Sequence, residues 1–113
     1  SPDQKLLLDD IKMIAKQTVD NLKNQHSSKY IDKEKLTQDE LNSIFVAVED
    51  ILLLQFGVDG NEIESYYIVL SRHLKALTKQ TYATKYRVII EYFAKTAKNE
   101  MSNVLKNEIM EYP

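Results

Sequence analysis

The 113-residue sequence contains no cysteine, no tryptophan, and only two glycines and two prolines. Without cysteine the chain cannot form disulfide bonds, bind zinc through thiolates or use a cysteine nucleophile. With so little glycine and proline it cannot make the many tight turns that a β-rich domain of this length needs. The sequence therefore predicts a few long helices, and the absence of cysteine favours a cytoplasmic location.

Long hydrophobic runs and catalytic motifs are missing as well. The longest apolar runs, residues 44–48 and 66–70, are far shorter than the roughly 18 residues that span a bilayer. Neither His26 nor His73 has an acidic residue at a spacing that would orient it as a general base, so we expect surface or boundary histidines. No metal-binding, phosphate-loop or nucleophile motif is present. We therefore expect a protein that is not an enzyme and that holds no metal or cofactor.

Helical periodicity begins in the first segment. A content of 43% hydrophobic and 28% charged residues over 113 residues is typical of one globular domain, which we place at residues 1–113. Apolar residues recur every three or four positions from Leu7 to Leu22, as on one face of a helix. Ser1 and Gln4 can form a capping box around Pro2 at the first helical position. We expect this helix to end near Gln25 and a loop to follow over residues 26–32.

The clearest local signal marks the start of the second helix. Thr37 and Glu40 have the spacing of a capping box, and Leu36 and Leu41 occupy the hydrophobic-staple positions. The helix that follows has a wide apolar stripe, so we expect it to be central. Gly57 is placed to end it.

Two further helices complete the predicted fold. Asp59 or Asn61 can cap a third helix, and Thr78 or Thr81 can cap a fourth that reaches Met110. The short connection between the second and third helices favours an antiparallel pair. The predicted fold class is all-α, an antiparallel four-helix bundle whose fourth helix is long or broken near Asn99. An overhanging end of that helix would expose apolar residues and favour a homodimer; these residues are Met101, Val104, Leu105, Ile109 and Met110.

Charge is unevenly distributed along the chain. Residues 36–64 contain seven acids and no Lys or Arg, whereas residues 65–98 contain seven bases and one acid, Glu91. Attraction between antiparallel neighbours and the dipole at the end of the third helix can explain part of this pattern. They do not explain Lys85 and Arg87, which lie in the first turns of the fourth helix, where the helix dipole disfavours cations.

A binding surface at the tip joining the third and fourth helices is the alternative explanation. The predicted binding residues are Arg72, Lys75, Lys79, Tyr82, Lys85, Tyr86 and Arg87. Tyrosines are numerous, and those on the apolar stripes are interpreted either as core-boundary residues or as the lining of a groove between these two helices. Phosphate, anionic lipid or an acidic protein would be attracted to such a tip.

Three functions fit these observations. The first is a regulatory module that binds an acidic protein partner through the third and fourth helices. The second follows from a resemblance: in size and helical layout the chain resembles the immunity proteins made alongside bacteriocins, which implies self-protection at the inner membrane surface. That resemblance covers layout alone, and the sequence pI of about 5.7 departs from it. The third is nucleic-acid binding, for which the acidic pI and the presence of only two arginines, Arg72 and Arg87, are unfavourable.

Overall fold

The protein is built from helices. The computed structural model describes residues 2–56, 68–74 and 83–111, with side chains over 8–56, 68–74 and 86–107. The helices are α1 (Pro2–Glu34), α2 (Gln38–Gln55) and α4 (Ala83–Glu111), and residues 68–74 form a short helical segment. These residues contain no strand, so the all-α prediction is confirmed. The antiparallel four-helix bundle stays a prediction, because residues 57–67 and 75–82, with Gly57 and the expected caps of the third and fourth helices, lie outside the described residues.

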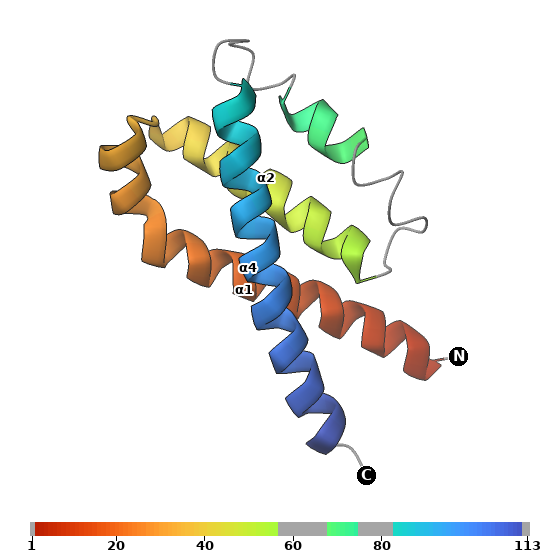
Figure 1. The fold of residues 1–113 in the computed structure, drawn as a ribbon. Helices are drawn as coiled ribbons and strands as arrows, with labels where there is room; N and C mark the ends of the chain where they lie inside the picture. Colours follow the sequence, from red (N-terminus) through yellow and green to blue (C-terminus); the bar gives the residue numbers. More distant parts are fainter. Residues whose placement is uncertain (1, 57–67, 75–82, 112–113) are drawn as a thin grey trace.

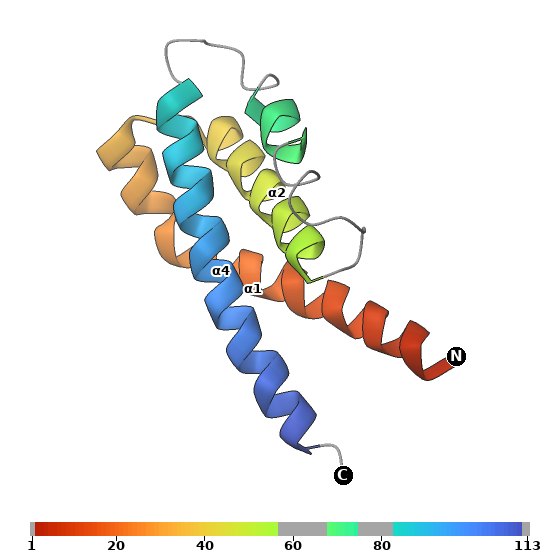
Figure 2. The ribbon, with the colours of Figure 1, turned by 45° about the vertical axis from the view of Figure 1, so that its right-hand side comes forward.

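The three long helices cross one another, and two of their ends diverge. In both ribbon views α4 begins near the same end of the molecule as α2 and runs past it in the same general direction, while α1 crosses beneath (Figures 1 and 2). The first half of α1 and the last turns of α4 then splay apart toward the two chain termini. The molecule measures 50 × 29 × 17 Å, and its radius of gyration of 15.0 Å exceeds the roughly 13 Å of a compact domain of this length.

The helix α1 is longer than the sequence predicts, and the loop predicted over residues 26–32 is wrong. The helix begins at Pro2, as expected, but continues to Glu34. The Ser27 hydroxyl donates to the backbone carbonyl of Lys23, while Tyr30 and Ile31 pack against the core. These tertiary contacts outweigh the modest helix preference of the polar run. Figure 1 shows α1 bending in its last third, a known effect of hydroxyls that bond back along a helix.

A tight connection joins α1 to α2. Lys35 has a φ of 55°, in the left-handed region, which stops α1 immediately after Glu34. The predicted capping box of α2 is confirmed: the Thr37 hydroxyl accepts from the Glu40 backbone N–H and the Glu40 carboxylate accepts from the Thr37 N–H, both at 3.1 Å. Leu36 and Leu41, at the staple positions, are both buried. The chain is therefore fixed at the entry to α2 by polar and apolar contacts together.

The helix α4 is continuous from Ala83 to Glu111, so of the two predicted forms the structure shows the long one, without a break at Asn99. The expectation that Met101 would be exposed is wrong, because its side chain is fully buried in the core. Val104 is 41% exposed and Leu105 is half-buried, whereas the side chains of Ile109 and Met110 lie outside the described set. The apolar overhang is thus shorter than predicted.

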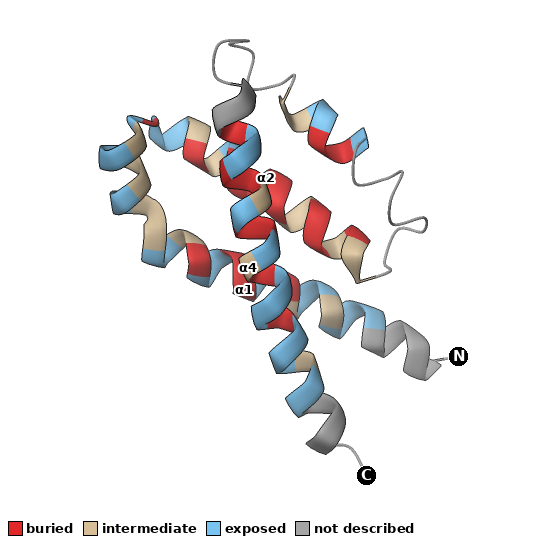
Figure 3. Ribbon diagram, viewed as in Figure 1, coloured by how far each residue is buried: buried red, intermediate tan, exposed pale blue. Residues whose placement is uncertain are grey.

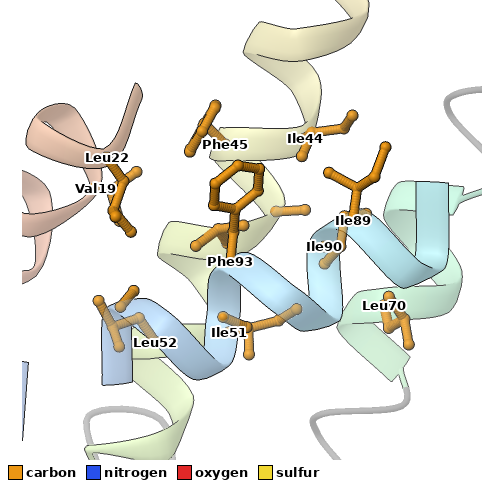
Figure 4. Close-up of a cluster of buried hydrophobic side chains, with 14 of the residues drawn as sticks. Val19, Leu22, Ile44, Phe45, Ile51, Leu52, Leu70, Ile89, Ile90 and Phe93 are labelled. Carbon is orange, nitrogen blue, oxygen red and sulfur yellow. The ribbon is translucent and has the colours of Figure 1, made fainter. Parts of the chain in front are cut away.

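The core lies where the three helices cross, and Phe93 of α4 is at its centre. Buried residues face inward on all three helices and on the short segment, while the opposite faces are exposed (Figure 3). The Phe93 ring, which is fully buried, lies among Phe45 of α2 and Val19 and Leu22 of α1 (Figure 4). Leu70 of the short segment, 2% exposed, belongs to the same cluster. Because α4 packs into the core with one face only, its opposite face is exposed to solvent.

Candidate interaction surface

The structure locates part of the predicted basic tip. Arg72 lies in the short segment and Arg87 in the second turn of α4, with side chains 66% and 52% exposed. Tyr86 is 2% exposed, so its ring packs in the core and does not line the surface. The remaining predicted binding side chains lie outside the described residues: Lys75, Lys79, Tyr82 and Lys85. The clustering of the six residues other than Tyr86 therefore stays a prediction.

An acidic residue of α2 lies against Arg72. The Asp50 Oδ2 atom is 2.9 Å from His73 Nε2 and 4.0 Å from the Arg72 guanidinium. The sequence has no Asp or Glu at a spacing that would orient His73 as a general base, and the acidic neighbour that the fold provides, Asp50, lies 23 positions away. Attraction between the acidic second helix and the basic segment, the simpler interpretation of the charge pattern, is thus present at this point.

Further acids lie near Glu49, the residue that precedes Asp50 in α2. Burial raises the pKa of the neighbouring Glu49 carboxyl; Asp20 of α1 and Asp50 raise it further, and Lys16 lowers it. Desolvation and repulsion from like charges therefore both raise the pKa of Glu49. Arg72 and His73 therefore contact α2 at Asp50, next to Glu49 in the sequence.

Arg87 is held differently. Its guanidinium Nε lies 3.1 Å from the Glu91 carboxylate on the next turn of the same helix. This spacing is a common helix-surface ion pair and contributes only about 0.3–0.5 kcal/mol. The pair leaves the Arg87 side chain half exposed near the start of α4, where the helix dipole disfavours a cation.

Exposed apolar side chains lie beside Arg87, on what we call the α4 outer face: Arg87, Val88, Tyr92 and Lys95. Val88 is 60% and Tyr92 54% exposed, and Lys95 follows three residues later. Positions separated by three or four residues share one side of a helix. Val88, Tyr92 and Lys95 therefore face solvent together, away from the buried stripe, and Arg87 with its ion-pair partner Glu91 lies along the edge of this face.

The Tyr92 ring contacts the buried aromatic cluster around Phe93. It lies 5.5 Å from Phe93 in an edge-to-face arrangement, and Phe93 in turn lies 5.0 Å from Tyr30 and 5.4 Å from His26 of α1. Burial raises the pKa of the Tyr30 phenol, with smaller contributions from Tyr92 and Glu34. Tyr92 thus lies on the α1 side of α4 and outside the predicted groove between the third and fourth helices.

Sequence reasoning misses this face because it groups Tyr92 with the tyrosines on or beside the apolar stripes and does not single out Val88. Their spacing from Tyr86 holds the relevant signal: Tyr86, Ile90, Phe93 and Ala97 share one side of the helix, and Tyr92 falls outside that series. His26 lies in α1 instead of the predicted loop, and its ring packs near Phe93.

The described residues also bear on metal binding and on membrane insertion. That part of the chain holds no group of three or more His, Cys, Asp or Glu side chains suited to a metal ion. None of its helices combines the length and apolar character that crossing a membrane requires. Comparisons with protein-family models, curated proteins and solved structures found no match for this chain.

Proposed function

We propose that this protein is a non-enzymatic regulatory module that binds an acidic protein partner through the short segment that carries Arg72 and through the α4 outer face. One observation carries the proposal: Val88 and Tyr92 are more than half exposed on one side of α4, between the cations Arg87 and Lys95. A tyrosine with arginine beside it and a small apolar neighbour is the composition from which interface hot spots are made.

The packing under Tyr92 strengthens the proposal. Because its ring is braced edge-to-face on the buried Phe93, less side-chain freedom is lost when a partner covers it. The cations at both sides favour carboxylates around the rim of the partner's apolar patch, which adds to specificity and to the rate of association.

A protein partner fits this face better than a lipid or nucleic-acid surface. Polyanions are attracted by clustered positive charge, whereas the chain has a net charge of −2 and seven acids between residues 36 and 64. Two exposed apolar side chains gain most from an apolar counterpart, which a partner helix or strand supplies.

Selection from a random displayed-peptide library tests the proposal even though the natural partner is unidentified. We expect the wild-type protein to enrich peptides that combine Asp or Glu with apolar residues. The variant Tyr92→Ala with Lys95→Glu should bind an enriched peptide roughly thirtyfold more weakly, as expected for loss of a hot spot.

The chain offers a matched control on another helix. Met13 is 68% exposed on α1 beside the exposed Lys12, so Met13→Ala with Lys12→Glu removes similar apolar area and makes the same charge change. This variant should bind the peptide within about twofold of wild type. Equal losses in the two variants, or enriched peptides without acidic residues, would contradict the proposal.

Two further assays address the alternative functions. If the protein enriches no peptides but co-sediments at low salt with vesicles that contain anionic phospholipid, the result would favour a self-protection protein that acts at the inner membrane surface. Binding to a DNA or RNA oligonucleotide that weakens steeply with salt would favour a nucleic-acid function. We expect neither at physiological ionic strength.

A further inference from the structure

The apolar stripe of α1 continues beyond the part of the helix that the core covers. Ala15 is fully buried, Ile11 packs partly buried against the core, and Leu8 is 41% exposed. Spacings of three and four residues place all three on one side of the helix, whereas Met13, 68% exposed, lies on the opposite side. The core-facing side of α1 therefore loses its cover gradually toward the N-terminus.

The stripe of α4 loses its cover in the same way toward the C-terminus. Met101 is fully buried, whereas Val104 is 41% exposed and Leu105 is only partly buried. Both stripes lose cover where the two helices splay apart (Figures 1 and 2), and there buried residues give way to intermediate and exposed ones (Figure 3). We call this part of the molecule the open end; it comprises residues 8–14 of α1 and 102–107 of α4.

The uncovered surface of the chain is large enough for an interface with one further copy. The chain exposes 7755 Å² to solvent. A compact monomer of 13.1 kDa exposes about 6,400 Å², so the excess is roughly 1,400 Å². A stable interface of standard size covers about 800 Å² on each partner. The excess therefore exceeds what a dimer needs.

We propose that the open ends of two copies pack together about a twofold axis, with the α4 end of each copy lying against the first half of α1 of the other. The same contact is then made twice, as twofold symmetry requires. Pairing of the α4 ends alone would leave Leu8 and Ile11 uncovered, whereas the crossed arrangement covers the stripes of both helices. The four helix ends form a small bundle that extends the core of each copy.

This dimer does not rest on the function proposed above, because it uses another side of α4. Val88 and Tyr92 lie on the side of α4 opposite the stripe that contains Met101 and Val104. Both α4 outer faces stay exposed in the dimer. The dimer therefore offers two copies of that face, and a partner with two acidic segments would bind it more tightly than it binds the monomer.

Crosslinking tests which helices meet. Because the chain contains no cysteine, a single introduced thiol on each copy reports only contacts between copies. The Leu8→Cys variant, labelled with a heavy isotope, is mixed with unlabelled Val104→Cys and oxidised mildly, and mass spectrometry follows the mixed disulfide. We expect this disulfide to form at least about tenfold faster than the one between Met13→Cys and Val104→Cys, because the contact raises the effective concentration of the thiols.

Self-association provides the second measurement. Leu8→Asp places a charge in the apolar contact and should raise the dimer dissociation constant at least about tenfold, measured by light scattering over a concentration series. Met13→Asp is the matched control on the opposite side of α1 and should stay within about twofold of wild type. Circular dichroism verifies that both variants are folded.

Three results would overturn the proposal. They are a wild type that stays monomeric, a Leu8→Asp variant that dimerises as wild type does, and a mixed disulfide that forms no faster than the Met13→Cys control. None of them bears on peptide selection by the α4 outer face, so the dimer and the proposed function can fail separately.

Discussion

Replacing Phe93 with leucine tests the centre of the fold. The Phe93 ring is fully buried and lies 4.7 Å from Phe45 of α2, 5.0 Å from Tyr30 and 5.4 Å from His26 of α1, and 5.5 Å from Tyr92. Leucine keeps much of the apolar volume, a change that by itself costs less than about 1.5 kcal/mol. Loss of several aromatic contacts, each worth about 0.5–1.5 kcal/mol, brings the expected destabilisation to about 2–3 kcal/mol.

Urea denaturation followed by far-ultraviolet circular dichroism measures this free energy of unfolding. A loss of this size is readily measured against the total stability of about 5–15 kcal/mol typical of a domain, and the folded state should survive it. Val88→Ala is the matched control on the same helix, since Val88 is 60% exposed and its truncation should change stability by no more than about 0.5 kcal/mol. If Phe93→Leu also changed stability by less than about 0.5 kcal/mol, the described packing would be refuted.

Four further predictions concern local features. Thr37→Ala removes half of the capping box and should lower the free energy of unfolding by about 1 kcal/mol, measured by urea denaturation; an unchanged value would mean that the cap is not formed in solution. Lys35→Gly relieves a left-handed backbone position and should raise the thermal midpoint, with a gain of about 1 kcal/mol; a lower midpoint would contradict the φ of 55°. Because burial and neighbouring acids raise the pKa of Glu49, its ionisation opposes folding as pH rises, so Glu49→Gln should stabilise the protein at neutral pH by up to about 0.5 kcal/mol and have less effect under acid conditions. The exposed Glu100 provides a control, and Glu100→Gln should leave stability unchanged at both pH values. We expect light scattering at high micromolar concentration to report a dimer that Val104→Asp returns to monomer; a monomeric mass for the wild type would exclude pairing through the end of α4.

Local signals in the sequence predicted the starts of α1 and α2 and most of the apolar stripes of α2 and α4. The capping box at Thr37 and Glu40 is encoded within four residues, so it can be found without reference to the rest of the chain. The apolar stripes of α2 and α4 likewise depend on spacing within one helix. Pro2 at the first position of α1 belongs to the same class of local signals.

The end of α1 could not be predicted in this way. No glycine follows Glu34, and a lysine in the left-handed region gives no sequence signal for a helix stop. The polar run over residues 26–32 resembles a loop, yet Tyr30 within it packs against Phe93 and the core. Helix formation there is decided by tertiary contacts that residue preferences do not contain.

The candidate site could be predicted from the sequence only in part, because it too depends on tertiary contacts. The His73–Asp50 contact joins residues that are 23 positions apart on different elements, so no spacing rule for a single helix detects it. The exposure of Tyr92 and the burial of Tyr86 depend on the rotation of α4 against its neighbours. Residue types alone assign the two tyrosines the same role.

The bend in α1 has a practical consequence for dividing the chain. Residues 26–32 lose the helical periodicity and resemble a connecting loop, so a fragment designed from the sequence could start or stop there. In the folded protein this stretch instead closes one side of the aromatic cluster through His26 and Tyr30. A protease should therefore spare these peptide bonds in the native state, and a fragment cut at this point would expose the Phe93 ring to water.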